Sequence, residues 1–237
     1  MRTSKLLIAV SVAASVAFLL ARPFTTSNWP VIPEVVSILL LAVIGFSIDR
    51  LLGAALAISS AGDFLLGVGQ FGSLDSESLF LLGLGSFLLA HLVYIAMFRK
   101  YRLSHWWKPG PARLLGVVTI LVALGSMLGI LRDSLGPMMF PVVLYSLVLC
   151  SMGISAMLAD LGSPLAAFGA LLFISSDAML AVGKFRGTFP GHDQLIWITY
   201  YAAQCLILLG VEHRHKSLFN TREFMPAPQT PGSRLTL

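Results

Sequence analysis

The chain has 237 residues, of which 57% are hydrophobic and only 11% are charged. A soluble domain carries roughly 25% charged residues, so this chain has too few to cover a water-facing surface. The composition excludes an ordinary soluble protein and favours one compact domain that is solvated mostly by lipid. The formal net charge of +5 fits attraction to anionic lipid headgroups and requires no nucleic-acid partner.

Eight apolar segments have the length of transmembrane helices. About 20 residues cross a hydrocarbon core of roughly 30 Å. Eight such spans use most of the chain, so they predict an all-α membrane protein that leaves no room for a soluble domain. In chain order they cover residues 4–21, 32–48, 51–70, 78–98, 113–131, 137–159, 163–184 and 194–211.

The two ends of the chain require separate interpretation. Arg2 and Lys5 before an apolar run are typical of a secretory signal, but the run Leu6–Leu20 is long for one and is not followed by a good cleavage site. We therefore interpret this segment as the first span. Residues 215–237 are rich in proline towards their end, and we expect them to form a disordered cytoplasmic tail.

The basic residues predict the orientation of the bundle. With eight spans, both termini lie on the same side as the loops after spans two, four and six. That side carries twelve Lys and Arg residues against four on the other, so both termini are expected in the cytoplasm, and in a bacterium the membrane would be the cell (inner) membrane. The twelve are Arg2, Lys5, Arg50, Arg99, Lys100, Arg102, Lys108, Arg113, Arg214, Lys216, Arg222 and Arg234; the four are Arg22, Arg132, Lys184 and Arg186.

Two segments of the chain share a pattern. Asp63–Phe71 reads Asp-Phe-Leu-Leu-Gly-Val-Gly-Gln-Phe, and Asp177–Phe185 reads Asp-Ala-Met-Leu-Ala-Val-Gly-Lys-Phe, at an offset close to half the chain. The pattern predicts a four-plus-four duplication with halves of about 1–105 and 106–214. Four helices return the chain to its starting side, so the halves would be related by a pseudo-twofold axis along the membrane normal. The two aspartates would then face each other at the same depth.

Few strongly polar groups lie well inside the predicted spans. A charged side chain in hydrocarbon costs roughly 2.5–3.5 kcal/mol on insertion scales, so such groups tend to face the interior of a bundle. Helical spacing places His91 and Tyr94 on one face, and Tyr200 and Gln204 on another. We expect these groups to line one cavity that opens to the non-cytoplasmic side. The set comprises Asp63, His91, Asp177 and Gln204, with Tyr94, Tyr145, Tyr200 and Tyr201 as half-polar companions.

Other polar residues are weaker candidates. Cys150 and Cys205 lie in different spans and predict neither a disulfide nor a metal site. His91 is the sole histidine in this intramembrane set, whereas zinc requires three or four ligands, so we favour a hydrogen-bonding role over a metal-binding one. Glu34 and Asp49 lie at span ends, where water can solvate them, and are interpreted as structural.

Two carboxyl groups held together in a low dielectric share one proton, because they cannot both ionise comfortably. Such a pair supplies an acid and a base at one site, as acid–base hydrolysis requires. The simpler alternative is that each aspartate bonds Ser, Tyr or backbone groups and only fixes helix packing. The alignment of Asp63 with Asp177 favours the catalytic interpretation.

Four blocks distributed along most of the chain carry a family resemblance. They are Ser60-Ala-Gly-Asp63 with Leu66; Phe87-x-x-x-His91-x-x-Tyr94-x-x-x-Phe98; Phe173-x-x-Ser176-Asp177-x-x-Leu180-Ala181-x-x-Lys184-Phe185; and Thr199-Tyr200-Tyr201-x-Ala203-Gln204-x-Leu206-Ile207. Through these blocks the chain resembles the YhhN family of multispan membrane proteins, whose characterised members are lysoplasmalogenases. The resemblance implies that Asp63 and Asp177 hydrolyse the vinyl ether bond of lysoplasmenylcholine or lysoplasmenylethanolamine, giving a fatty aldehyde and a glycerophospho-base.

This activity needs neither a cofactor nor a covalent intermediate. An acid protonates the β-carbon of the vinyl ether, and water captures the resulting oxocarbenium ion; near-symmetry leaves open which aspartate is the acid. We expect the alkenyl chain to lie among apolar helices and the headgroup to lie outward near Lys184, Arg186 and Tyr200. The remaining substrate-binding candidates are His91, Tyr94, Tyr201 and Gln204.

Two other functional classes fit the same pattern. Parallel repeats with a carboxylate pair suit a proton-coupled transporter of a small molecule or lipid, which would need a path open alternately to both sides. An intramembrane aspartyl protease is the third class. Its two aspartates usually lie on neighbouring spans, whereas here they are four spans apart.

Overall fold

The computed structural model describes residues 2–24, 30–71 and 75–223. Within these ranges the chain forms eight α-helices and short 3-10 turns, which confirms the predicted all-α class. The helices are α1 (Arg2–Ala21), α2 (Val31–Ile48), α3 (Arg50–Phe71), α4 (Ser76–Lys100), α5 (Pro111–Leu131), α6 (Met139–Met157), α7 (Leu165–Phe185) and α8 (His192–Glu223).

The helix starts follow local sequence signals. Asp75 precedes α4 and accepts a hydrogen bond from the backbone N–H of Glu77 at 3.0 Å, as expected of an N-cap residue. Pro111 is the first residue of α5, where its missing N–H is not needed. Gly162 and Gly191 have positive φ angles of 67° and 80° in the loops before α7 and α8, where the turns require a residue without a side chain.

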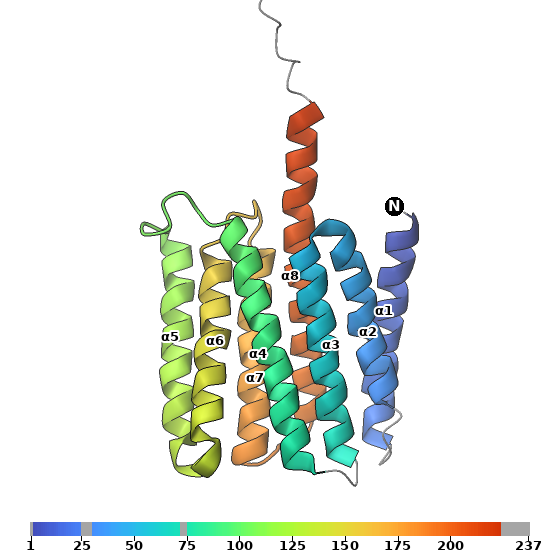
Figure 1. Ribbon diagram of the computed structural model, residues 1–237, viewed down its shortest axis with the longest axis vertical. Helices are drawn as coiled ribbons and strands as arrows, with labels where there is room; N and C mark the ends of the chain where they lie inside the picture. Colours follow the sequence, from blue (N-terminus) through green and yellow to red (C-terminus); the bar gives the residue numbers. More distant parts are fainter. Residues whose placement is uncertain (1, 25–29, 72–74, 224–237) are drawn as a thin grey trace, which may run out of the picture.

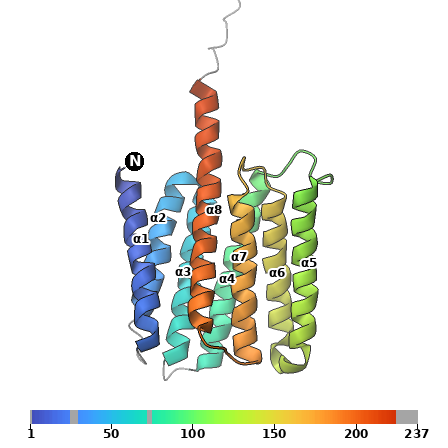
Figure 2. The same cartoon turned by 180° about the vertical axis from the view of Figure 1, so that it is seen from behind.

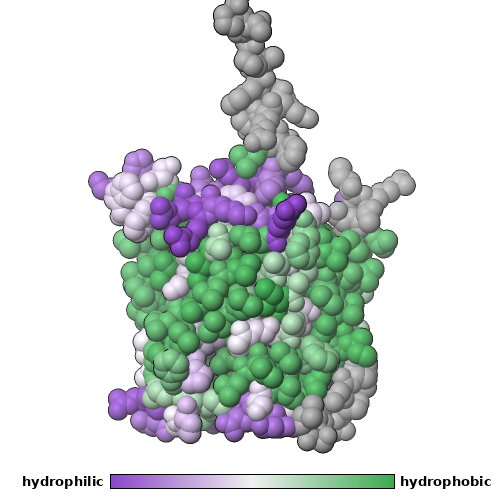
Figure 3. All heavy atoms as spheres, in the orientation of Figure 1, coloured by the Kyte–Doolittle hydropathy of each residue, from purple (hydrophilic) through white to green (hydrophobic). Residues whose placement is uncertain are grey.

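Seven helices, α2 to α8, are long and apolar enough to span a membrane, so the chain is a multi-pass membrane protein. The apolar helix Lys5–Ala21, within α1, is shorter than these seven. Figure 3 shows an apolar band across the face in view, with polar residues at both ends of the bundle. The span formed by α1 therefore stays a prediction, whereas the other seven agree with the sequence pattern.

The helices stand side by side in a bundle, with α1 and α5 at opposite edges (Figures 1 and 2). Helix α3 packs between α2 and α4, α7 packs against α8, and α4 and α6 are also in contact. Helices α7 and α8 approach each other closely at Gly169, which has no side chain. A Cβ atom at this position would lie only 2.8 Å from the carbonyl oxygen of Ala203. Small residues at such crossings allow helix backbones to approach each other in a membrane.

Helix α8 continues to Glu223 and projects beyond the bundle (Figure 1). It therefore passes the predicted boundary at 214 and includes the first residues of the segment 215–237 that was predicted to be disordered. The reason is that no proline or glycine occurs between His215 and Glu223, and Lys216 pairs with Glu212 one turn earlier at 2.6 Å. Residues 224–237 lie outside the described residues.

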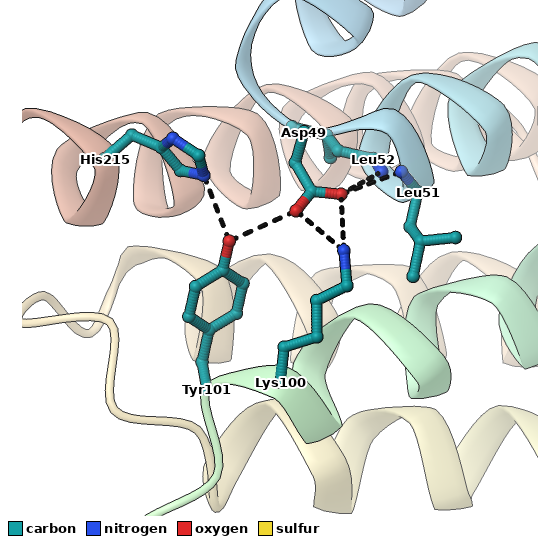
Figure 4. Close-up of polar contacts among 6 residues, drawn as sticks. All are labelled: Asp49, Leu51, Leu52, Lys100, Tyr101 and His215. Carbon is teal, nitrogen blue, oxygen red and sulfur yellow. Dashed lines mark hydrogen bonds and ion pairs between the residues drawn. The ribbon is translucent and has the colours of Figure 1, made fainter.

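A polar cluster ties three helix ends together at the end of the bundle near the projecting part of α8 (Figure 4). Asp49, between α2 and α3, accepts hydrogen bonds from the backbone N–H of Leu51 at 2.7 Å, from Lys100 at 3.0 Å and from the Tyr101 hydroxyl at 3.2 Å. The Tyr101 hydroxyl also lies 3.0 Å from Nε2 of His215 in α8. These contacts agree with the structural role inferred for Asp49.

This cluster predicts an acid-dependent loss of stability. Burial raises the pKa of Asp49, but hydrogen bonds from Lys100 and Leu51 outweigh burial, and the net pKa is lowered. A carboxyl group with a lowered folded-state pKa stabilises the fold above its unfolded value of about 4, and this contribution is lost as the pH falls through the folded pKa. Asp49→Asn should therefore lower the melting temperature in detergent by about 2–4 °C near pH 7, and the difference should vanish in acid.

The matched control is Asp133→Asn, because the Asp133 side chain is 76% exposed and its ion pair within the described part of the chain is with its neighbour Arg132. Its melting temperature should follow that of the parent protein at every pH. An Asp49→Asn difference that persists unchanged at the most acidic pH would show that the carboxylate charge is not what stabilises the cluster.

Candidate functional site

A cavity of about 580 Å³ extends into the bundle and contains both predicted catalytic aspartates on its wall. We call it the polar cavity. Its lining includes Arg22 at the end of α1, Ser76 at the start of α4, and Thr188 and Asp193 around the α7–α8 loop. These segments lie at the end of the bundle opposite the projecting part of α8 (Figure 1). The cavity therefore reaches this end of the bundle.

Asp63 lies on α3 and is 5% exposed. Its Oδ2 atom accepts a hydrogen bond from the hydroxyl of Tyr200, on α8, at 2.9 Å. The residue before Asp63 is Gly62, whose lack of a side chain lets α4 pack closely on α3. A Cβ atom at Gly62 would lie only 2.6 Å from the ring of Phe87. That ring in turn packs edge-on against Tyr200, with ring centroids 5.8 Å apart. Packing from two helices thus fixes the group that orients the Asp63 carboxyl.

Asp177 lies on α7 and receives a hydrogen bond from the Tyr145 hydroxyl of α6 at Oδ2. Each aspartate therefore has one tyrosine donor from a neighbouring helix, which leaves oxygen atoms available for other partners. A tyrosine hydroxyl both orients a carboxyl group and satisfies part of its hydrogen-bonding capacity. The result is two oriented carboxyl groups on the wall of the same cavity.

Tyr94 and Gln204 lie behind this wall. Both are fully buried, and the Tyr94 hydroxyl donates to Oε1 of Gln204 at 2.6 Å. Gln204 lies one helical turn after Tyr200 on α8, so the pair connects α4 to the helix that carries the Asp63 partner. Neither residue lines the polar cavity; the pair supports its wall from behind, and the substrate-binding role of the two residues stays a prediction.

His91 is also fully buried behind the wall. Its ring packs edge-on against Phe173 and Tyr145, with centroid distances of 4.8 Å and 5.5 Å. Neither ring nitrogen has a hydrogen-bond partner among the described residues, so the hydrogen-bonding role predicted for His91 is not found there. The described ranges contain no group of three or more His, Cys, Asp and Glu residues that would hold a metal ion.

The His91 ring supports the tyrosine that orients Asp177. His91→Ala should therefore loosen Tyr145 and lower aldehyde release from a lysoplasmenyl lipid by at most about 10²-fold, because misplacement of a reacting group by about 1 Å has an effect of this size. His91→Phe, which restores a ring, should recover most of the turnover. Complete loss of turnover together with release of bound metal would instead identify His91 as a metal ligand.

The other predicted binding residues lie in three different places. Lys184 and Tyr200 line the polar cavity, and the Lys184 ammonium lies 4.7 Å from the centre of the Phe80 ring. Tyr201 lies outside the lining and faces α1, where its hydroxyl is 2.7 Å from Oγ of Ser11. Arg186 donates to the backbone carbonyl oxygen of Ile130 and is not among the lining residues.

The polar cavity also contains charged residues that the sequence interpretation did not select. Arg22 forms an ion pair with Asp193 at 3.2 Å, and His192 lies 3.0 Å from the same carboxylate. Glu34, interpreted from the sequence as a structural residue at a span end, lies on the cavity wall. The sequence features that could have indicated this group were a single arginine, Arg22, after the first span and a glutamate, Glu34, in the first turn of the second span. Only the packing of α1, α2 and α8 brings these groups together.

Comparisons with known proteins identify relatives of this chain. The chain is 35% identical over 166 residues to the lysoplasmalogenase of Mycobacterium tuberculosis, which covers 68% of this chain and 60% of that protein. It is 37% identical over 162 residues to human lysoplasmalogenase TMEM86B, covering 68% and 63%, and 32% identical over 206 residues to the mouse protein, covering 84% and 82%. The matches thus span less than two thirds of the mycobacterial and human relatives.

No solved structure has significant similarity to the chain. The sequence model of the YhhN family matches residues 29–211, a range that includes Asp63, Asp177, the whole of helices α2 to α7 and α8 as far as Val211. This match confirms the resemblance inferred from the four sequence blocks. The chain belongs to the YhhN family.

Proposed function

We propose that this protein is a membrane-embedded lysoplasmalogenase, which hydrolyses the vinyl ether bond of a lysoplasmenyl phospholipid. One observation carries the proposal: Asp63 and Asp177, from different parts of the chain, line the same cavity with one tyrosine donor each. The relatives named lysoplasmalogenase support the substrate class. The products are a fatty aldehyde and a glycerophospho-base.

The proposed reaction uses one carboxylic acid and one carboxylate. The acid transfers its proton to the β-carbon of the vinyl ether, and the oxocarbenium ion that results is stabilised by the carboxylate. Water attacks this ion and gives its proton to the carboxylate. The hemiacetal then collapses to the aldehyde and the alcohol, and both carboxyl groups return to their starting states.

The two tyrosines act as positioning residues in this proposal. Tyr145 and Tyr200 each donate a hydrogen bond to one oxygen of an aspartate. The second oxygen of each carboxyl group is then the one that exchanges protons with substrate or water. Holding both carboxyl groups in a defined orientation lowers the entropic part of the barrier.

The charges at the outer part of the cavity suit a zwitterionic headgroup. Arg22 and Lys184 on the lining attract a phosphate, and Asp193 attracts an ammonium or trimethylammonium group. The aromatic ring of Trp197, also on the lining, adds a face suited to a quaternary ammonium ion. Arg186, which bonds a backbone carbonyl elsewhere, is not part of this proposed headgroup site.

A parallel duplication and a cytoplasmic location of both termini complete the proposal. Support for the duplication comes from the packing of α3 on α4, which has a counterpart in α7 on α8, and from α4 on α6, which has a counterpart in α8 on α2. The start of α1 and the projecting end of α8 lie at the same end of the bundle (Figures 1 and 2). With both termini in the cytoplasm, the polar cavity opens on the opposite side.

The experiment that tests this function is the mass-spectrometric detection of aldehyde from purified protein in detergent. The panel contains lysoplasmenylcholine, lysoplasmenylethanolamine, and the matching lysolipids with an alkyl ether or an ester bond. Aldehyde should appear only from the two vinyl ether lipids. A protein that binds these lipids, or moves them across vesicles, without releasing aldehyde would be a carrier rather than a hydrolase.

A further inference from the structure

A second, apolar cleft lies directly behind Asp177. It has a volume of about 70 Å³ and is formed by α4, α5, α6 and α7. Among its lining residues, all of which are described, only Tyr145, Ser146 and Asp177 carry a side-chain oxygen or nitrogen. The rest of the wall is aliphatic, aromatic or sulfur-containing. We call this space the apolar cleft.

The apolar cleft and the polar cavity meet at Asp177. Three residues line both spaces, namely Phe80, Asp177 and Leu180. Asp63, in contrast, lines only the polar cavity. The two aspartates therefore differ in their surroundings: Asp177 stands at the boundary between a charged space and an apolar space, and Asp63 faces the charged space alone.

A lysoplasmalogen has the same division at its reacting bond. Its vinyl ether joins the polar glycerophospho-base to a long hydrocarbon chain, so the scissile bond lies where the polar part ends. We propose that the apolar cleft holds the hydrocarbon chain next to the vinyl ether, with the bond itself at Asp177 and the headgroup in the polar cavity. This inference rests on the proposed function and specifies how its substrate is bound.

Beyond the cleft, the hydrocarbon chain of the substrate continues towards the membrane lipid beside α5. The narrow cleft holds only the first carbons of a long chain, and the remainder must leave it. Within α5, which is described over its whole length, only Ile120 and Leu131 are buried, and the helix stands at the edge of the bundle (Figures 1 and 2). Because this wall of the cleft is a peripheral helix, the hydrocarbon tail of the substrate can leave sideways into the lipid. The tail then does not have to cross the charged outer part of the polar cavity.

The position of the cleft also distinguishes the roles of the two aspartates. The β-carbon of the vinyl ether, C2′, lies on the chain side of the bond, so it lies next to Asp177. This position at the junction of the two spaces assigns the delivery of the proton to Asp177. Its O–H bond breaks as the C1′=C2′ electron pair forms the new C2′–H bond, which leaves the oxocarbenium ion at C1′.

Asp63 completes the reaction from the polar side. Water forms a bond to C1′ and gives a proton to the Asp63 carboxylate. The hemiacetal hydroxyl then returns a proton to Asp177, the bond from C1′ to the glycerol oxygen breaks, and that oxygen takes the proton from Asp63. Both aspartates finish in their starting protonation states, and the net reaction consumes one water molecule.

A chain-length test examines the cleft directly. Ala181 lines the apolar cleft but not the polar cavity, so Ala181→Leu should narrow the chain site and leave the headgroup site intact. For an 18-carbon alkenyl substrate, kcat/KM should fall by at least about 10-fold, since one methylene in a tight apolar pocket has an effect of about 10–200-fold. A substrate with an ethenyl ether, which has no carbon beyond C2′ to enter the cleft, should be hydrolysed at the parent rate. The matched control is Ala96→Leu, at a lipid-facing site of α4 outside both linings.

A labelling test does not depend on turnover. A non-hydrolysable alkyl ether lysolipid with a diazirine near the start of its chain is photo-crosslinked to the parent protein and to Ala181→Leu. The label should map to the α5 and α6 walls, including Met127 and Leu149, and should decrease in the variant. Labelling of the polar-cavity wall at Phe18 or Trp197, or an equal loss of activity for both chain lengths in a folded variant, would overturn the chain site. Cleft labelling without aldehyde release would instead refute only the proposed hydrolase activity.

Discussion

Asp177→Asn is expected to lower aldehyde release from lysoplasmenylcholine by about 10²- to 10⁴-fold, the usual range for loss of a general acid or base. Asparagine has the same shape, and its amide oxygen can still accept the hydrogen bond from Tyr145 that Asp177 accepts. The fold and the helix packing should therefore persist. What is lost is the exchangeable carboxyl proton that we assign to C2′. Initial rates of aldehyde formation by detergent-solubilised protein measure the effect.

Asp133→Asn serves as the matched control, because Asp133 is an exposed residue of the turn after α5 and lines neither the polar cavity nor the apolar cleft. Its turnover should equal that of the parent protein. Gel filtration and melting temperature establish that Asp177→Asn remains folded. Near-normal turnover in a folded Asp177→Asn protein would show that the aspartate pair serves helix packing, as the simpler interpretation of the sequence has it.

The helices could be predicted from the sequence because lipid imposes a strong constraint on composition. The segment predicted at 78–98, for example, corresponds to α4, Ser76–Lys100. Its ends were underestimated because a charged first or last turn extends beyond the apolar core of a span. The same effect explains α8, which continues into polar residues that carry no helix-breaking signal before Pro226. Apolar length predicts that a span exists, and turn chemistry decides where its helix stops.

The two aspartates could also be selected from the sequence, because a carboxyl group inside an apolar span is too costly to be incidental. Their partners could not be selected in the same way. Tyr145 was one of several half-polar residues, and only the packing of α6 on α7 brings its hydroxyl to Asp177. Tyr201 has the same residue type and a neighbouring position to Tyr200, but the helix turn directs it towards Ser11 instead.

The group of charged residues at the outer part of the polar cavity could not be predicted from the sequence, for a different reason. Arg22, Glu34 and Asp193 belong to three helix ends that are far apart in sequence. A charge at a span end is normally solvated by water or headgroups, so its presence alone says nothing about a site. Their convergence depends on how α1, α2 and α8 pack, and no periodic pattern within one helix records that packing.

Asp63→Asn is expected to lower aldehyde release as strongly as Asp177→Asn, by about 10²- to 10⁴-fold, but it keeps the group that delivers the proton to carbon. Asp177 still lines the junction of the two spaces in this variant and still protonates C2′. Without the base, water capture of the oxocarbenium ion becomes slow, and the ion returns to vinyl ether by giving a proton back to Asp177. In deuterated water the unreacted substrate should therefore gain deuterium at C2′, which mass spectrometry detects.

Asp177→Asn should show neither aldehyde release nor deuterium gain, since it lacks the group that delivers the proton. The comparison separates the two carboxyl groups by the bond that each one makes, although both variants are nearly inactive by the usual assay. If deuterium instead enters the substrate with Asp177→Asn and not with Asp63→Asn, the two roles are exchanged. The apolar cleft would then no longer identify the acid, because the proton would come from the aspartate that faces only the charged space.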